Sequence, residues 1–87
     1  MSNLTALYHC AFLVHLGEPV SGVLSNQPYV LRSLPDEFGV MELEQLSVVG
    51  PPDLPESALT FKRTGTLHFL YINWVISLTP VAGGTIQ

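Results

Sequence analysis

This sequence has few charged residues. Of its 87 residues, 3 are Lys or Arg and 7 are Asp or Glu, so charged side chains make up 11% of the chain, against about 25% in an average soluble protein. Disordered chains are polar and highly charged, whereas this chain is 47% hydrophobic, so it is expected to fold. So few charges cannot cover a compact domain of this size, which favours self-association or assembly into a larger particle over a monomer with an uncharged polar surface.

Basic residues are too few for direct binding to nucleic acid. Lys62 and Arg63 are adjacent, Arg32 is the only other cation, and the net charge is −4. Binding to a phosphate backbone requires a cluster of cations that displaces counterions. The sequence therefore predicts no nucleic-acid partner, and it excludes a basic helix on a membrane surface.

Cysteine is nearly absent. Cys10 is the single thiol, so an intrachain disulfide and a cysteine-based zinc site are both excluded. One unpaired cysteine fits a reducing compartment. No Lys or Arg precedes the N-terminal apolar stretch, so no signal peptide is recognisable. We expect the protein to be cytoplasmic or part of a virion or other assembly.

Long apolar runs are also missing. The two longest apolar stretches, Leu4–Leu16 and Leu67–Leu78, contain polar interruptions. Each is shorter than the roughly 18 to 20 residues that cross a bilayer as a helix. A membrane is therefore not an expected partner.

The N-terminal segment alternates in a way that favours a strand. One face would carry only apolar residues, and the other would be mixed with Thr5, His9 and His15. A helix is the rival interpretation, because Leu and Ala favour helices. The apolar face would consist of Leu4, Ala6, Tyr8, Cys10, Phe12, Val14 and Leu16.

The middle of the chain predicts short elements. Segment 20–31 favours strands, but Pro28 cannot donate to a sheet, so an edge strand or two short strands are expected. Ser33 and the carboxylates of Asp36 and Glu37 predict a helix of one or two turns. A strand from Val40 to Val49 should follow, with a longer helix to Leu46 as the alternative.

The last third predicts a hairpin. Segments 58–62 and 66–79 flank Arg63-Thr64-Gly65, a three-residue loop with Gly in its last position. The second arm is apolar on both faces, so it should be central in the domain or covered by another subunit. One face would carry Leu70, Ile72, Trp74, Ile76 and Leu78, and the other Leu67, Phe69, Tyr71 and Val75.

These elements predict a mainly β fold, with β-rich α+β as the alternative. The expected architecture is a small barrel or two-layer sandwich of about five strands with one short helix. Residues 1–87 should form a single small domain, because the chain is too short for more. Gly83-Gly84 suggests that residues 83–87 form a loose C-terminal tail.

The sequence offers no constellation for catalysis. His9, His15 and His68 are the candidate bases and Cys10 the candidate thiol. Neighbouring His9 and Cys10 would point to opposite faces of a strand, so only a cross-strand pair of Cys10 with His68 is available. No metal-ligand spacing or phosphate loop is present, and Glu42 and Glu44 are expected to be solvated surface charges. We therefore expect no enzyme activity, no catalytic residue, no metal and no cofactor.

The expected function is that of a structural or assembly protein that oligomerises or packs on a larger partner. A small virion component, such as a capsid-decorating or assembly protein, has this charge-poor character. The alternative is a small acidic inhibitor or adaptor that occludes a site on another protein. Core packing is slightly favoured for Trp74, but aromatic residues also anchor interfaces. The predicted interface residues are Phe69, Tyr71, Trp74, Leu67 and Val75.

Overall fold

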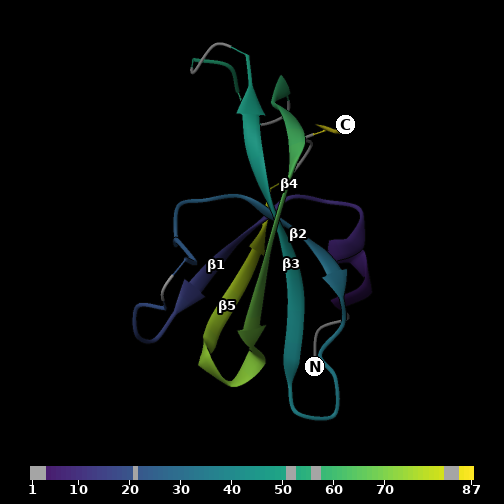
Figure 1. Ribbon diagram of the computed structural model, residues 1–87. Coiled ribbons are helices and arrows are strands. Elements are labelled where there is room, and N and C mark those ends of the chain that lie inside the picture. The colour runs from purple at the N-terminus through teal and green to yellow at the C-terminus, as the bar shows by residue number, and fades with distance from the viewer. Residues whose placement is uncertain (1–3, 21, 51–52, 56–57, 82–84) are drawn as a thin grey trace.

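A computed structural model describes residues 4–20, 22–50, 53–55, 58–81 and 85–87, and in these residues the protein is mainly β, as the sequence predicts. All helical segments in this part of the chain are short 3-10 turns. The elements shown in Figure 1 are η1 (Leu4–Tyr8), β1 (Phe12–Leu16), β2 (Tyr29–Ser33), β3 (Val40–Val49), β4 (Thr60–Tyr71), η3 (Ile72–Trp74), β5 (Val75–Pro80) and β6 (Thr85–Ile86).

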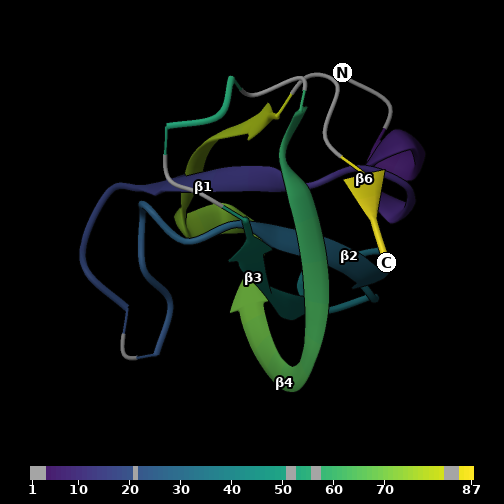
Figure 2. The ribbon, with the colours of Figure 1, turned by 90° about the horizontal axis from the view of Figure 1, so that it is seen from above.

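The strands form one sheet that curls on itself. Their order is β5-β1-β2-β3-β4-β6, and every neighbouring pair is antiparallel except β4 and β6. The chain leaves β4, turns through η3 and returns as β5, which pairs with β1 at the opposite end of the sheet. Figure 2 shows the resulting curvature around a central space. The result is a small, partly open barrel, because β4 and β5 are joined by the chain but do not pair.

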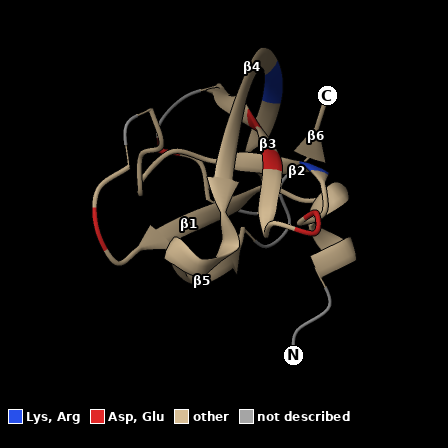
Figure 3. Cartoon of the chain, turned by 60° about the horizontal axis from the view of Figure 1, so that its bottom comes forward, with Lys and Arg blue, Asp and Glu red and all other residues tan. Residues whose placement is uncertain are grey.

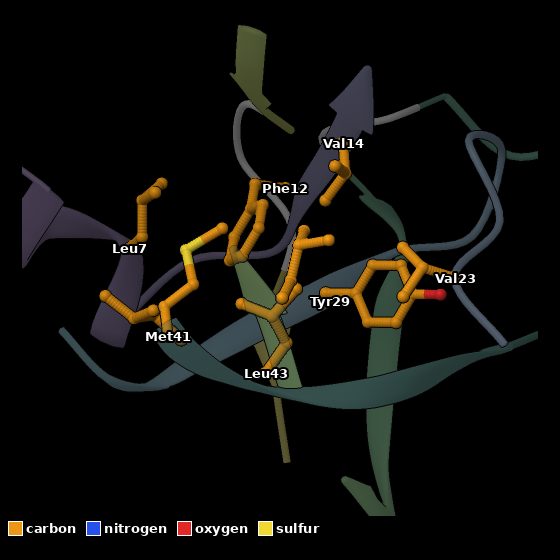
Figure 4. Packing of buried hydrophobic residues seen from close by; sticks show 9 residues of the cluster. Leu7, Phe12, Val14, Val23, Tyr29, Met41 and Leu43 are labelled. Atoms are coloured by element: carbon orange, nitrogen blue, oxygen red, sulfur yellow. The ribbon is translucent and has the colours of Figure 1, made fainter. Parts of the chain in front are cut away.

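The main core fills the concave side of this sheet. Alternate residues of the strands point inward, as period-2 patterning requires, and Phe12, Tyr29, Met41 and Leu43 are completely buried. Figure 4 shows these side chains meeting from β1, β2 and β3. The cluster consists of Leu7, Phe12, Val14, Val23, Tyr29, Leu31, Met41, Leu43 and Leu70.

A second, smaller core lies on the opposite face of the sheet. Ala11, Val30, Leu46 and Phe61 are buried there. The C-terminal strand β6 covers this cluster, because the amide of Thr85 donates to the carbonyl of Leu59 and the amide of Gln87 donates to the carbonyl of Phe61. Partly buried Leu59, Val81 and Ile86 complete it.

The C-terminal residues correct one expectation. Residues 85–87 were expected in a loose tail, but Thr85 and Ile86 pair in parallel with Thr60 and Phe61. Burial of Ile86 against the second core supplies the apolar contact that holds this end of the chain. Residues 83 and 84 lie outside the described residues.

The N-terminal segment is only partly a strand. Leu4–Tyr8 forms the 3-10 helix η1, and the strand begins at Phe12. The reason is tertiary, because η1 buries Leu7 in the main core. The Tyr8 hydroxyl also accepts a hydrogen bond from the amide of Leu34 at 3.1 Å. The strand prediction therefore holds for the second half of the segment alone.

The segment between β2 and β3 is a tight loop and not the predicted helix. One carboxylate oxygen of Asp36 accepts from the amides of Phe38 at 2.9 Å and Val40 at 3.0 Å. Gly39 has a φ of 79°, which stops helical propagation. The strand prediction for Val40–Val49 is confirmed.

The predicted hairpin at residues 63–65 is wrong. These residues lie inside the continuous strand β4, where Leu46 pairs with Arg63 but Glu44 pairs with Leu67. β4 therefore carries extra residues opposite β3, which is a bulge. Gly65 adopts a φ of 80° within it. The predicted long arm 66–79 is divided by η3 into the end of β4 and β5.

Segment 20–31 also differs in detail. Val20 and Val23 form a single isolated bridge, and β2 starts at Tyr29, directly after Pro28. The Pro28 carbonyl accepts a hydrogen bond from the amide of Leu46. Pro28 thus takes part in the sheet only as an acceptor, as its missing N–H requires.

Within the described ranges, no helix has the length and apolar character needed to cross a bilayer.

Candidate interaction surface

Three exposed apolar side chains follow one another on the outer side of β4. The neighbouring residues His68 and Leu70 point into the barrel, and Leu70 is 1% exposed. Leu67, Phe69 and Tyr71 alternate with them and are 45%, 67% and 44% exposed. We call these three residues the β4 outer face. Apolar residues exposed in a row mark contact surfaces more often than isolated ones do.

A buried carboxylate separates the β4 outer face from the second core. Glu44 pairs with Leu67 across the sheet and is 4% exposed. One of its oxygens accepts from the Arg63 guanidinium at 3.1 Å and lies 3.6 Å from that of Arg32. The other accepts from the Gly65 amide at 3.1 Å. The expectation that Glu44 is a solvated surface charge is therefore wrong.

This ion network uses two of the three basic residues of the chain. Figure 3 shows acidic colour on β3 next to basic colour on β4, while the rest of β4 carries no charge. Thr64 reinforces the bulge, because its hydroxyl donates to the carbonyl of Gln45 at 2.7 Å. The network thus fixes the backbone immediately before the β4 outer face.

The corner after β4 extends the apolar surface. The rings of Tyr71 and Trp74 lie edge to face, with centroids 4.8 Å apart. Trp74 is 48% exposed, so the slight preference for core packing is wrong for this residue. Ile76, on β5, is also largely exposed. Val75 is different, because it is partly buried and packs against the main core.

The backbone N–H and C=O groups of the β4 outer face are directed toward a free edge of the sheet. The Ile72 amide donates to the Gly39 carbonyl on the β3 side at 2.7 Å. Because backbone groups in a strand alternate in direction, those of residues 70 and 68 also point to β3. Those of residues 67, 69 and 71 point away from it. β6 occupies this edge only at Thr60 and Phe61, and no other described strand pairs along it.

A shallow open groove lies beside the corner. It has a volume of about 680 Å³ and runs between segment 17–20 and segment 73–76. The amide of Gly17 donates to the carbonyl of Trp74 at 3.2 Å and holds the two segments together. Glu18 is the charged residue that lines this groove. No cation in the described part of the chain forms an ion pair with it.

The residues considered for chemistry are placed apart from this surface. Cys10 is partly buried against the main core, and its burial raises the pKa of the thiol. His68 lies edge-on to the Tyr29 ring, and its Nε2 is 3.2 Å from the Gln45 side-chain oxygen. The polar partner of His68 is therefore Gln45 and not Cys10. Among the described residues, no three His, Cys, Asp or Glu side chains gather in a metal-binding arrangement.

No protein-family model, curated protein or solved structure matches this chain. Of the five predicted interface residues, the structure brings Leu67, Phe69, Tyr71 and Trp74 onto one exposed surface and turns Val75 away from it. The Glu44 network was not predicted from the sequence. The one available signal was an acidic residue in the same register as the apolar residues of a strand.

Proposed function

We propose that this protein is a non-enzymatic structural or assembly protein that packs the β4 outer face and Trp74 against a copy of itself or a larger partner. The observation that carries the proposal is the coincidence of exposed apolar side chains and outward-directed backbone groups at residues 67, 69 and 71. Contact with a partner removes that apolar surface from water and satisfies those backbone groups.

The distribution of charge supports this proposal. Residues 64–71 include no Asp, Glu, Lys or Arg, and the neighbouring Arg63 is engaged by Glu44. Trp and Tyr are enriched among the residues that dominate the binding energy of interfaces, and Tyr71 and Trp74 are both exposed on this surface, together with Phe69. A place in a virion, as a capsid-decorating or assembly component, remains part of the proposal because of the short, charge-poor character of the chain.

Replacement of Phe69 by Lys tests the proposal. Light scattering over a wide concentration range should show association for the wild-type chain and a monomer for Phe69→Lys, because the new ammonium group would have to be desolvated in the interface. The Phe69 side chain is largely exposed, so the free energy of unfolding should change by no more than about 0.5 kcal/mol.

Leu24→Lys is the matched control. Leu24 is 62% exposed, close to the value for Phe69, but it lies in the loop between β1 and β2. Leu24→Lys should change association only by the general effect of one added positive charge, and therefore much less than Phe69→Lys. Equal losses in the two variants would contradict a role for the β4 outer face.

A monomeric inhibitor or adaptor is the second candidate, and one observation favours it. The groove between segments 17–20 and 73–76 combines the exposed Trp74 ring with the carboxylate of Glu18, which forms no ion pair with the described residues. Such a site suits a basic segment of another protein. A chain that stays monomeric at high concentration, and whose binding to a partner is weakened by Glu18→Gln, would favour this function over the first.

A further inference from the structure

We propose that the occupant of the β4 edge is a second copy of this chain, added as an antiparallel strand with Phe69 opposite Phe69 of the other copy. This inference rests on the proposed function and specifies its partner and register. In this arrangement residue 67 of each copy lies opposite residue 71 of the other. The two β4 strands then join two curled sheets into one continuous sheet.

The backbone is matched in this register. In an antiparallel pair, residues whose N–H and C=O groups face each other exchange two hydrogen bonds. Residues 67, 69 and 71 all direct these groups to the free edge, as the Ile72 to Gly39 hydrogen bond and the pairing with β3 establish. Pairing 67 with 71, 69 with 69 and 71 with 67 therefore gives each outward N–H of the segment an acceptor and gives the carbonyls of Leu67 and Phe69 a donor. The Tyr71 carbonyl, at the N-cap of η3, already accepts the first hydrogen bond of that turn.

Other registers leave groups unmatched. A shift that pairs residue 67 with residue 69 places Tyr71 opposite Gly65, whose amide already donates to Glu44. The opposite shift places Leu67 opposite Asn73, where the chain has turned into η3. The bulge at one end and the corner at the other thus bound the free edge to residues 67–71.

The side chains are matched as well. Residues that face each other in an antiparallel pair lie on the same face of the sheet. The apolar side chains of Leu67, Phe69 and Tyr71 from both copies would form one cluster, with Phe69 at its centre. Each is at least 44% exposed in the single chain. Aromatic cross-strand pairs are among the more stabilising side-chain pairs in sheets.

Charge does not oppose this contact, although each copy carries −4. The nearest carboxylate with no cation beside it is that of Glu42, which pairs with Phe69 across the sheet. The two Glu42 residues would be three strand spacings apart, or about 14 Å. That separation exceeds the Debye length of about 8 Å at physiological ionic strength. The self-complementary, uncharged edge thus fits a second copy.

Cysteine cross-linking tests the register. In a Cys10→Ala background, Phe69→Cys should form an intermolecular disulfide under oxidised glutathione. Residues directly opposite in such a pair have Cα atoms about 5.5 Å apart, within the range that a disulfide can bridge. Leu67→Cys and Tyr71→Cys should cross-link when the two variants are mixed, but neither should cross-link with itself.

Leu24→Cys is the control, because Leu24 is 62% exposed but lies in the loop between β1 and β2 and outside the β4 edge. It should form no disulfide above the level of random collision. The cross-links are compared with light scattering of the wild-type chain and Phe69→Lys. Association that Phe69→Lys abolishes, without the matched cross-links, would overturn this register and leave the proposed function standing. A wild-type chain that is monomeric at all concentrations would overturn the proposal that the partner is a second copy. The proposed function would then stand only in the form in which the chain packs on a larger partner.

Discussion

At the scale of single residues, Glu44 is the most constrained polar group among the described residues. It is the one buried charged residue there, and its oxygens accept from the Arg63 side chain and the Gly65 amide. A buried carboxylate is costly unless it is hydrogen-bonded and paired, and here it is both. Glu44 thereby stabilises the bulge that shapes β4.

Removal of this carboxylate should destabilise the fold. We expect Glu44→Ala to lower the free energy of unfolding by about 1.5 to 3 kcal/mol, because hydrogen bonds to a charged group are lost and the Gly65 amide loses its acceptor. Denaturant unfolding followed by fluorescence measures the change. Glu42→Ala is the control, since Glu42 is two residues away, less buried and without an ion pair. Equal losses in both variants would show that the network contributes nothing.

At the scale of elements, β4 connects the second core to the candidate interaction surface. It contains the Gly65 bulge, ends in the η3 corner and pairs with both β3 and β6. The bulge adds residues to β4 opposite β3, so one strand passes from the second core to the exposed β4 outer face. A sequence window cannot distinguish such a bulge from a hairpin turn, because both use a glycine with positive φ.

Gly65→Ala should therefore destabilise β4. A φ of 80° is costly for any residue with a Cβ, and we expect a loss of about 1 to 2 kcal/mol in the free energy of unfolding. The space above Gly65 is open, so a steric clash contributes nothing. Gly17→Ala is the matched control, because its φ is not positive and its added Cβ would meet Ile76 at an ordinary 3.8 Å. A stable Gly65→Ala variant would contradict the bulge.

The strand from Val40 to Val49 was predictable, and the N-terminal segment was not. β3 alternates from Val40 to Leu43 and pairs on both sides, so local pattern and tertiary context agree in its first half. The segment from Leu4 to Leu16 alternates as well, but burial of Leu7 and the contact of Tyr8 with Leu34 favour a 3-10 turn in its first half. Tertiary packing overrides a weak local preference there.

At the scale of the whole molecule, the curl of the sheet decides which side of β4 is core. Leu70 points into the barrel and Phe69 points out of it, although both are large and apolar. Trp74 lies outside as well, so Trp74→Lys should leave the chain folded. The slight preference for core packing of Trp74 placed this residue on a single long strand over residues 66–79, which the η3 corner interrupts.

Substitutions at the neighbouring β4 residues Leu70 and Phe69 should show that the first side chain lies in the core and the second does not. Leu70→Ala should lower the free energy of unfolding by about 2 to 5 kcal/mol, because it leaves a cavity in the main core. Phe69→Ala should change it by less than about 0.5 kcal/mol, since the side chain is largely exposed in the single chain. Both are measured by denaturant unfolding at a concentration where the wild-type chain is monomeric. Similar losses would contradict the orientation of β4.

The sequence by itself determined the mainly β fold and the charge-poor composition. These follow from composition and from period-2 alternation, which depend on local chemistry. Only the tertiary structure decided that Glu44 is buried, that Gly65 forms a bulge and that residues 67–71 lie at a free edge. Each of these depends on which strands pair and how the sheet curls. Such contacts join residues far apart in the chain, so no local pattern records them.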